Sequence, residues 1–301
     1  MRVLITGATG LVGSELVSIL HQNAVDVHYL STSKDKIKSE NNFKGFYWDP
    51  HKGIMDESAF IGVDAIVHLA GASIDGRWTD SYKQEIIESR IFSANLLFNT
   101  LKNNPNQVRQ FVSASAIGIY PDSLTKIYTE DSREKATDFL GNVVEKWEAG
   151  VDRFDRIGIK VCKLRTGLVL SDSGGALPQM AKPIKLGIGA AFGSGKQIQS
   201  WIHVRDLAQM YFYALQHQLE GVYNAVAPNP VSNEVLTKSI AKTLSKPIIL
   251  PNIPKFAMNL LLGEMHQLLF SGQFVSSKKI SAAGFNFQFP ELDQALKDLL
   301  Q

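Results

Sequence analysis

The stretch Val3-Leu4-Ile5-Thr6-Gly7-Ala8-Thr9-Gly10-Leu11-Val12-Gly13 decides the fold of this chain. A short run with apolar, strand-favouring character leads into three glycines, and a helical pattern starts directly after them. Gly7 allows a sharp turn out of the strand, Gly10 lets the backbone approach a pyrophosphate, and Gly13 lets the helix pack closely on the strand. The first N–H groups of a helix have no partners within it, so they can meet the negative charge. This order predicts a dinucleotide-binding site; the alternative is an ordinary glycine-rich turn.

Length and charge restrict the class of protein. A chain of 301 residues can form one large α/β domain or two domains that share an interface. Its net charge of +2, with scattered lysines, argues against a nucleic-acid partner. The single cysteine, Cys162, lies in an apolar run and cannot form an internal disulfide, so we expect a small strand residue there and not a reactive thiol.

The sequence contains no obvious targeting or membrane segment. The N-terminus opens on a strand pattern and not on a signal peptide. The most apolar helical stretch, 256–270, is too short to span a bilayer, so we interpret it as a packed helix or a dimer contact. We therefore expect a cytoplasmic protein with no membrane partner, and a homodimer is plausible.

Strand-like and helical runs alternate over the first two-thirds of the chain. Strands are expected at 3–6, 25–30, 46–48, 65–69, 110–113, 160–165 and 222–226, with helices at 14–21, 81–103 and 139–155. Strands separated by helices predict right-handed crossovers and a doubly wound parallel α/β sheet of the Rossmann type. Ligands of such sheets bind beyond the carboxyl ends of the strands.

The pattern changes after residue 170. Glycines and prolines at 173–175 and 187–195 suggest long shaped loops in place of a compact helix. We therefore expect a dinucleotide-binding domain at 1–170 and a smaller substrate-side lobe at 171–301, with 200–230 returning to the main sheet.

Several short stretches together resemble one family. The glycine turn, His68-Leu69-Ala70-Gly71 and Ser113-Ala114-Ser115 resemble the extended short-chain dehydrogenase/reductase superfamily. The chain more narrowly resembles its NAD-dependent epimerase/dehydratase-like group with a DUF1731-type C-terminal segment. That narrower resemblance rests on Arg77-Trp78-Thr79, Ser89-Arg90, Leu164-Arg165-Thr166-Gly167, Gly174-Gly175-Ala176-Leu177, Trp201-Ile202-His203 with Asp206, Tyr223-Asn224-Ala225 with Ala227-Pro228, and Gly263-Glu264-Met265. It covers nearly the whole chain and implies a nicotinamide cofactor and a small-molecule substrate.

The end of the second strand indicates which cofactor is preferred. NAD enzymes usually place an acid there for the ribose hydroxyls, whereas this chain has Ser31-Thr32-Ser33-Lys34. Hydroxyls and a lysine can hold a 2′-phosphate, so we expect NADP, with NAD less favoured. Lys34 by itself fits a solvated loop lysine equally well. Asp49 follows the third strand and is either an adenine contact or a turn residue before Pro50.

Other residues are expected to contact the cofactor because they follow strands. Small residues after a strand let the backbone lie against ribose and phosphates. The complete expected set is Gly7, Thr9, Gly10, Leu11, Val12, Gly13, Thr32, Ser33, Lys34, Leu69, Ala70, Gly71, Ser113, Ala114 and Thr166.

The usual catalytic pair of the superfamily is missing. Active relatives carry a tyrosine and, four residues later, a lysine that lowers the pKa of the phenol for proton transfer. Alignment on Glu148 puts Leu140 and Val144 at those positions, and no tyrosine of the chain has a lysine four residues later. Lys146 lies two residues away, on another side of the helix.

Ser115 and Tyr120 are the remaining catalytic candidates. Ser115 matches the serine that hydrogen-bonds the reacting oxygen in active relatives, and Tyr120 is the nearest phenol. Tyr120 is equally an aromatic residue that packs on a loop, which is the simpler interpretation.

A group of cationic and aromatic residues is expected on the substrate side: Arg77, Trp78, Arg90, Arg165, Gln199, Trp201 and His203. Arginines bind carboxylates or phosphates, and tryptophans stack on rings, so we expect an anionic substrate, which could be linked to a nucleotide or a sugar. The alternatives are structural: ion pairs for Arg90 and Asp206, core positions for the two tryptophans and an ordering role for His203. No spacing indicates a metal site.

Two functions remain open. One is an NADP(H)-binding, nucleoside-diphosphate-sugar epimerase-like oxidoreductase, in which Ser115 polarises an oxygen and Tyr120, His203 or a water supplies the proton. The other is a non-catalytic protein that binds NADP(H) and reports redox state to a partner. The missing tyrosine and lysine favour the second function, and the polar and aromatic substrate side favours the first.

Overall fold

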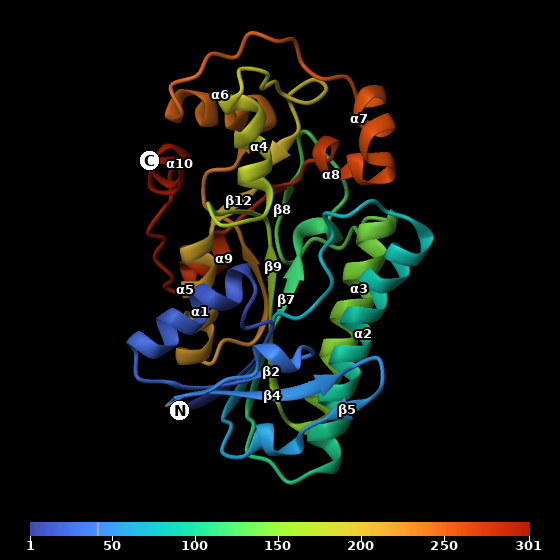
Figure 1. The fold of residues 1–301 in the computed structure, drawn as a ribbon, viewed down its shortest axis with the longest axis vertical. Coiled ribbons are helices and arrows are strands. Elements are labelled where there is room, and N and C mark those ends of the chain that lie inside the picture. Colours follow the sequence, from blue (N-terminus) through green and yellow to red (C-terminus); the bar gives the residue numbers. More distant parts are fainter. Residues whose placement is uncertain (41) are drawn as a thin grey trace.

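The computed structural model describes residues 1–40 and 42–301, and a nine-stranded, mainly parallel sheet forms its centre (Figure 1). The strands of this sheet are, in spatial order, β13 (Gly221–Ala225), β9 (Lys160–Thr166), β7 (Gln110–Ala116), β6 (Ala65–His68), β1 (Arg2–Thr6), β2 (Asp26–Ser31), β4 (Phe43–Asp49) and β3 (Ser39–Glu40), with β5 (Ile54–Met55) paired to β4. From β1 the chain proceeds to β2 and β4, then returns to the other side of β1 with β6. The sheet is therefore doubly wound, as predicted, and its strand order reverses between β1 and β6.

Two pairs of helices cover the sheet, one pair on each face. Helices α1 (Leu11–Gln22) and α5 (Val204–Gln216) pack together on one face, and α2 (Asp80–Asn103) and α3 (Phe139–Asp152) on the other (Figure 1). Alternation along β1 explains the division, because Val3 and Ile5 belong to the first core and Leu4 to the second. Full burial of such a side chain contributes roughly 1.5–3 kcal/mol, so the apolar run that precedes Gly7 stabilises both layers at once.

The second lobe lies beyond the carboxyl ends of the strands. It contains α4 (Ala176–Lys185), α6 (Asn233–Thr243), α7 (Lys255–Leu262), α8 (Gln267–Phe270) and α10 (Leu292–Leu300), with the short pairs β10 (Leu168–Leu170) with β12 (Trp201–His203), β11 (Ile198–Gln199) with β14 (Val231–Ser232), and β15 (Phe274–Val275) with β8 (Ile127–Tyr128). Helix α9 (Lys278–Ala282) packs instead on β13, at the side of the main sheet. A third core, which includes Leu177, Trp201, Leu236 and Leu296, holds the lobe together. Between lobe segments the chain returns to the main sheet as β13, where Gly221 is paired with Cys162.

Two sequence expectations are refined in this lobe. The stretches 173–175 and 187–195 are loops, as predicted, but the helix between them, α4, was missed; its buried Leu177 and Ile184 pack into the lobe core. Stretch 256–270 is divided into α7, a 3-10 turn and α8, because Gly263 adopts φ +60° between the helices. Its Phe256 and Leu260 are 77% and 86% exposed, so the first half of this stretch is not packed within the chain. Within the described part of the chain, no helix combines the length and apolar character needed to cross a membrane.

Candidate functional site

The glycine turn has the geometry that the sequence predicts. Gly7 ends β1 with φ +76°, and the Gly10 amide donates to its carbonyl at 3.0 Å. A Cβ on Gly13 would lie 2.1 Å from the Gly7 carbonyl oxygen, so only glycine fits where α1 passes the turn. No side chain caps the start of α1 at Gly10. The first amide groups of the helix are therefore available to an anion, which is what a pyrophosphate requires.

The loop after β6 lies directly against this turn. A Cβ on Gly7 would meet the backbone of Leu69 and Ala70 at 3.1 and 3.2 Å. The amides of Leu69 and Ala70 both donate to the Thr6 hydroxyl at 3.1 Å. These two residues can therefore line the cofactor with their backbone surface, but their N–H groups are already bonded within the protein.

A buried histidine extends this contact into α2. Nδ1 of His68 lies 2.8 Å from the Thr6 hydroxyl, and its Nε2 lies 3.2 Å from the Ser93 hydroxyl. Burial lowers the pKa of His68 to about 3, so the imidazole is neutral. Since Thr6 accepts two amide hydrogens, its own hydrogen goes to Nδ1, and Nε2 carries the ring proton toward Ser93.

The end of β2 is a compact hydroxyl turn. The Ser31 hydroxyl donates to the Ser33 carbonyl at 2.9 Å and accepts from the Ser33 amide at 3.1 Å. Thr32 and Lys34 are exposed, and Nζ of Lys34 lies 5.1 Å from the ring centroid of Tyr47. The turn thus presents two exposed side chains, a hydroxyl and an ammonium, just beyond the strand.

Asp49 closes a turn of its own at the end of β4. Its carboxylate accepts from the Lys52 amide at 3.2 Å and pairs with the Lys52 ammonium at 3.2 Å. Burial raises the pKa of Asp49, but the bonds from Lys52 outweigh it and hold that pKa below its usual value. The carboxylate is therefore used as a turn residue in this structure.

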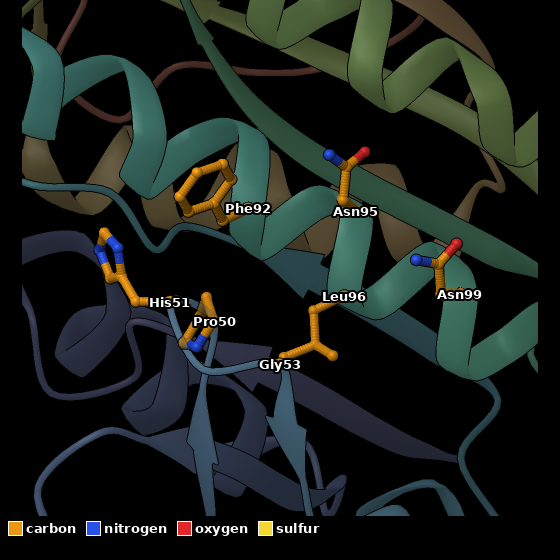
Figure 2. Close-up of a pocket in the computed structure, with 7 residues that line it drawn as sticks. All are labelled: Pro50, His51, Gly53, Phe92, Asn95, Leu96 and Asn99. Carbon is orange, nitrogen blue, oxygen red and sulfur yellow. The ribbon is translucent and has the colours of Figure 1, made fainter.

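A groove of about 230 Å³ opens beside this turn, against the outer side of α2 (Figure 2). Its lining residues are Pro50, His51, Gly53, Phe92, Asn95, Leu96 and Asn99. The His51 ring meets the Phe92 ring edge-on with 5.4 Å between centroids, so aromatic and amide groups form the walls.

Side chains of α2 fasten the loop at 71–79. The Ser89 hydroxyl accepts from the Ala72 amide at 2.9 Å, and Arg90 donates to the Ala72 carbonyl at 3.2 Å. Trp78 is 5% exposed, and its indole donates to the Ile74 carbonyl at 2.9 Å. Arg77, in contrast, is exposed. Of the expected substrate-side residues on this loop, Arg77 is open to solvent and Trp78 is part of a small core with Ile86 and Val143.

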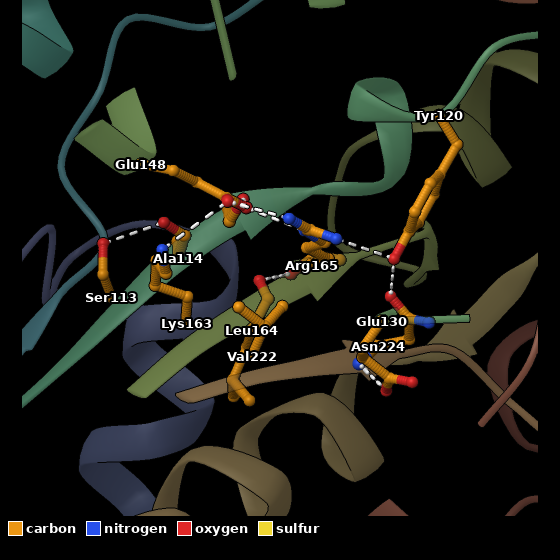
Figure 3. A network of polar contacts seen from close by, with 12 residues as sticks. Ser113, Ala114, Tyr120, Glu130, Glu148, Lys163, Leu164, Arg165, Val222 and Asn224 are labelled. Carbon is orange, nitrogen blue, oxygen red and sulfur yellow. Dashed lines mark hydrogen bonds and ion pairs between the residues drawn. The ribbon is translucent and has the colours of Figure 1, made fainter. Parts of the chain in front are cut away.

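A buried polar network joins β7, α3, β9 and β13 (Figure 3). The Ser115 hydroxyl donates to Oε1 of Glu148 at 2.6 Å, and Arg165 donates to the two Glu148 oxygens at 2.8 and 2.9 Å. Arg165 also donates to the Tyr120 hydroxyl at 2.9 Å, and that hydroxyl donates to Oδ1 of Asn224 at 2.8 Å. Ser115 and Tyr120 are 3% and 1% exposed. Both hydroxyl hydrogens are therefore directed into the protein in this state.

The negative charge of Glu148 in this network is compensated by the neighbouring cations Arg165 and Lys163. Burial by itself raises the pKa of Glu148, but the bonds from Arg165 and Ser115, together with the charge of Lys163, hold that pKa below its usual value. Burial also raises the pKa of Tyr120, which Arg165 only partly offsets. Lys163 lies 3.6 Å from Glu148 and also pairs with Asp152. The network is thus a carboxylate held between two cations, with a neutral phenol at its far end.

Three further expected cofactor residues stand at the same edge of the sheet. Ser113 is fully buried, and its hydroxyl donates to the Ala114 carbonyl at 2.8 Å. Ala114 and Thr166 are partly buried, and the Thr166 hydroxyl donates to the Leu164 carbonyl at 3.3 Å. Strand register places Ala116 opposite Thr166 at the carboxyl ends of β7 and β9.

Trp201 and His203 lie inside the lobe. Both are 0% exposed, and the Trp201 indole donates to the Asn229 carbonyl at 2.9 Å. His203 accepts from the Arg205 amide at 3.1 Å at the start of α5, and its ring stacks on Phe289 with 3.8 Å between centroids. Burial lowers the pKa of His203 to about 4, against the opposing effect of Asp298. These two side chains hold the lobe to α5 and have no surface to offer a ligand in this state.

Gln199 and Asp206, the other polar residues noted near Trp201 and His203 in the sequence, make contacts within the protein. Gln199 is partly buried and pairs with Val231 in the β11–β14 ladder. Asp206 accepts from the amides of Gln288 and Phe289 at 2.8 and 2.9 Å and is not part of an ion pair in the described residues. The roles of Glu148 and Asn224 in the network were missed in the sequence, because neither residue type nor spacing shows that they converge.

Comparisons with known proteins agree with this architecture. Residues 3–226 match the model of the NAD dependent epimerase/dehydratase family, and residues 253–299 match a domain of unknown function, DUF1731. Epimerase family protein YfhF of Bacillus subtilis is 36% identical over 301 residues, which are 100% of this chain and 98% of the relative.

Two solved structures are similar over the whole chain. Human epimerase family protein SDR39U1, crystallised with NADPH, is 31% identical with a TM-score of 0.86, and 99% of each chain is covered. A nucleoside-diphosphate sugar epimerase from Corynebacterium glutamicum is 31% identical with a TM-score of 0.80, covering 100% of this chain and 58% of that one. The glycine turn, the doubly wound sheet and these similarities lead to one conclusion: the chain belongs to the NAD dependent epimerase/dehydratase family.

Proposed function

We propose that this protein is an NADP(H)-dependent oxidoreductase of the epimerase type that acts on a small anionic substrate. The observation that carries the proposal is the combination of an uncapped α1 behind the glycine turn with a β2 end that has hydroxyls and Lys34 in place of a carboxylate. Support also comes from the similar human protein, whose structure contains NADPH.

The described residues fit a dinucleotide along the edge of the sheet. Amides at the start of α1 would hold the pyrophosphate, and Thr32, Ser33 and Lys34 would hold the 2′-phosphate. Leu69, Ala70 and Gly71 would line the ribose and phosphates, with Ser113, Ala114 and Thr166 toward the nicotinamide. When bound, the cofactor supplies the ability to accept or donate a hydride at nicotinamide C4.

Proton transfer must be arranged differently from that of a tyrosine–lysine enzyme. Tyr120 and His203 are buried and bonded within the protein, which favours water as the proton source among the predicted alternatives. Ser115 could polarise a substrate oxygen only after its hydroxyl turns away from Glu148. The charged state of Glu148 would then be kept by Arg165, so the serine can move without leaving a carboxylate unpaired.

The test has two stages. First, NADPH and NADH are titrated into the protein and into Lys34→Ala; we expect NADPH to bind more tightly, and the substitution to weaken NADPH by roughly tenfold while leaving NADH unchanged. Exposed Lys36→Ala is the matched control on the same turn. Equal affinities for the two cofactors would refute the NADP preference.

The second stage measures turnover. Oxidation of NADPH is followed against a panel of carbonyl compounds with a carboxylate or phosphate group, for the wild type and Ser115→Ala. We expect at least one substrate above background and a loss of rate in the variant. Because an epimerase returns the hydride to its substrate, background oxidation refutes only net reduction by NADPH. Tight NADPH binding with neither net oxidation nor epimerisation of any anionic substrate would refute the enzyme and support the non-catalytic, redox-reporting function.

A further inference from the structure

Arg90 is a cation that meets no acidic partner among residues 1–40 and 42–301. It lies in the middle of α2, where its Nη1 donates to the carbonyls of Ala72 at 3.2 Å and Ile86 at 2.9 Å. Burial lowers the pKa of Arg90 to about 10, opposed only by the Tyr82 phenol, and no carboxylate of the described residues contributes. Arg90 is partly buried, and desolvated charges are ordinarily paired, but among the described residues the guanidinium has only two carbonyls and the Trp147 ring as partners.

A second side chain at the same place is also missing an acceptor. Nε of Arg90 and Nε1 of Trp147 are both closed off from solvent, and neither has a hydrogen-bond partner in the part of the chain that the structure describes. Trp147 is 7% exposed, and Cζ of Arg90 lies 5.0 Å from the centroid of its ring. Unpaired buried donors are rare in proteins, and two of them side by side on adjacent helices point to one absent acceptor.

Gly71, one of the residues expected to contact the cofactor, lies directly against the guanidinium of Arg90. A Cβ on Gly71 would lie 3.1 Å from Cζ of Arg90, so any other residue there would cover the cation. Gly71 is exposed and directly follows Leu69 and Ala70, whose backbone lies against Gly7. On the proposed function, the backbone of Gly71 therefore stands between the guanidinium and the bound ligand.

We propose that Arg90 and Trp147 form an anion-binding site beneath Gly71 that takes a phosphate or carboxylate oxygen of the bound ligand. This proposal rests on the proposed function, which supplies the ligand: either the pyrophosphate of NADP(H) or the anionic group of the substrate. Binding requires the two side chains to shift toward Gly71, which gives their unpaired N–H groups an acceptor and the cation a counter-ion.

The competing explanation is that Arg90 only fastens the loop through Ala72. Variants that keep or remove the positive charge at position 90 distinguish the two explanations. A neutral donor can still hydrogen-bond the Ala72 carbonyl, but it cannot neutralise a bound anion. The variants are Arg90→Lys, which keeps the charge, Arg90→Gln, which keeps a donor, and Trp147→Phe, which removes one N–H from a nearly unchanged ring. Exposed Arg109→Gln, at the amino end of β7 and so away from the glycine turn, is the control.

Inorganic pyrophosphate and phosphate are titrated by calorimetry at low ionic strength, alone and in the presence of saturating NADPH. We expect Arg90→Gln to weaken pyrophosphate binding about tenfold or more and Trp147→Phe about threefold, with Arg90→Lys intermediate and Arg109→Gln unchanged. A parallel loss of NADPH affinity identifies the cofactor's pyrophosphate as the natural group. Unchanged NADPH affinity, with phosphate still bound in the NADPH complex, identifies the substrate's group.

The proposal is overturned if the wild type binds neither anion, if Arg90→Gln binds as tightly as the wild type, or if Lys and Gln variants lose equal affinity. NADPH binding in any of these cases leaves the proposed function standing. Conversely, pyrophosphate binding that depends on Arg90, in a protein that binds no NADPH, refutes the proposed function and keeps the anion site.

Discussion

The Thr6 hydroxyl lies 2.8 Å from Nδ1 of His68, and the two residues stand opposite each other in the register of β1 and β6. These are the strands between which the order of the sheet reverses, where the cofactor crevice of such folds opens. The hydroxyl also holds the amides of Leu69 and Ala70, so one side chain sets the height of the loop over the glycine turn.

This contact predicts how stability depends on pH. The pKa of His68 is about 3 in the folded protein and about 6.5 unfolded, so only the unfolded chain takes up this proton between those values. The stability is complete above pH 6.5 and falls as the pH falls, by about 2 kcal/mol at pH 5 from this residue. In urea unfolding from pH 7.5 to 5, the free energy of unfolding should depend less steeply on pH in His68→Gln than in the wild type.

The glycine turn should not tolerate a methyl group at its third position. Gly13→Ala places a Cβ 2.1 Å from the Gly7 carbonyl oxygen, and α1 must move away from the turn. We expect a loss of about 1–3 kcal/mol and a large loss of NADPH affinity. Gly150→Ala is the control, because a Cβ there meets only Ala94 at 3.8 Å in a helix; it should be neutral or stabilising by up to ~1 kcal/mol. Thermal melts and NADPH titration measure both.

Removing the negative charge from the buried network should strongly destabilise the fold. Glu148→Gln leaves Arg165 without its counter-ion, and we expect a loss of about 3–5 kcal/mol in chemical denaturation. Glu145, on the same helix, makes an exposed pair with Lys135, so Glu145→Gln should cost less than about 1 kcal/mol. Similar losses in the two variants would contradict the assignment of this network.

Tyr120→Phe tests whether the phenol holds the structure. The substitution removes an acceptor from Arg165 and a donor from Asn224, both buried, so stability should fall by about 1–3 kcal/mol. Tyr213→Phe is the comparison. Its hydroxyl donates to the Ala283 carbonyl from a less buried position, so this variant should lose less stability. An unchanged unfolding midpoint for Tyr120→Phe would show that these bonds contribute nothing.

Cys162 should be inert in the folded protein. It is 0% exposed, and burial raises its pKa to about 12, so very little thiolate forms at neutral pH. Reaction with a thiol reagent should be at least a hundredfold slower than in urea. Rapid labelling without denaturant would mean that β9 opens readily.

The elements near the glycine turn could be predicted because the local sequence there directly reflects how each residue is packed in the folded protein. The run at Val3–Ile5 is apolar throughout since both faces of β1 are covered, and the glycines are required where backbone segments meet. Helix α4 could not be predicted in the same way. Pro178 and Pro183 lie near its two ends, where proline is tolerated or ends the helix, and its partners on α6 come more than 50 residues later.

The polar residues near the cleft were harder to predict. Residue type places Arg165, Trp201 and His203 on a substrate side, but burial depends on what covers them. Glu148 reaches Arg165 from α3, and Asp298 reaches His203 from the last helix. Such contacts depend on how distant segments pack, which spacing along the chain does not encode.

Because the chain returns to the sheet as β13, the second lobe is attached to the sheet at two neighbouring strands. Lobe segments depart from the end of β9 and again from the end of β13, and these are neighbouring strands in register from Gly221 to Ala225. Both attachment points thus lie side by side on one rim. Residues can be inserted, exchanged or deleted above that rim without altering any strand pairing below it, so the lobe can diverge among descendants while the sheet and its glycine turn are inherited intact.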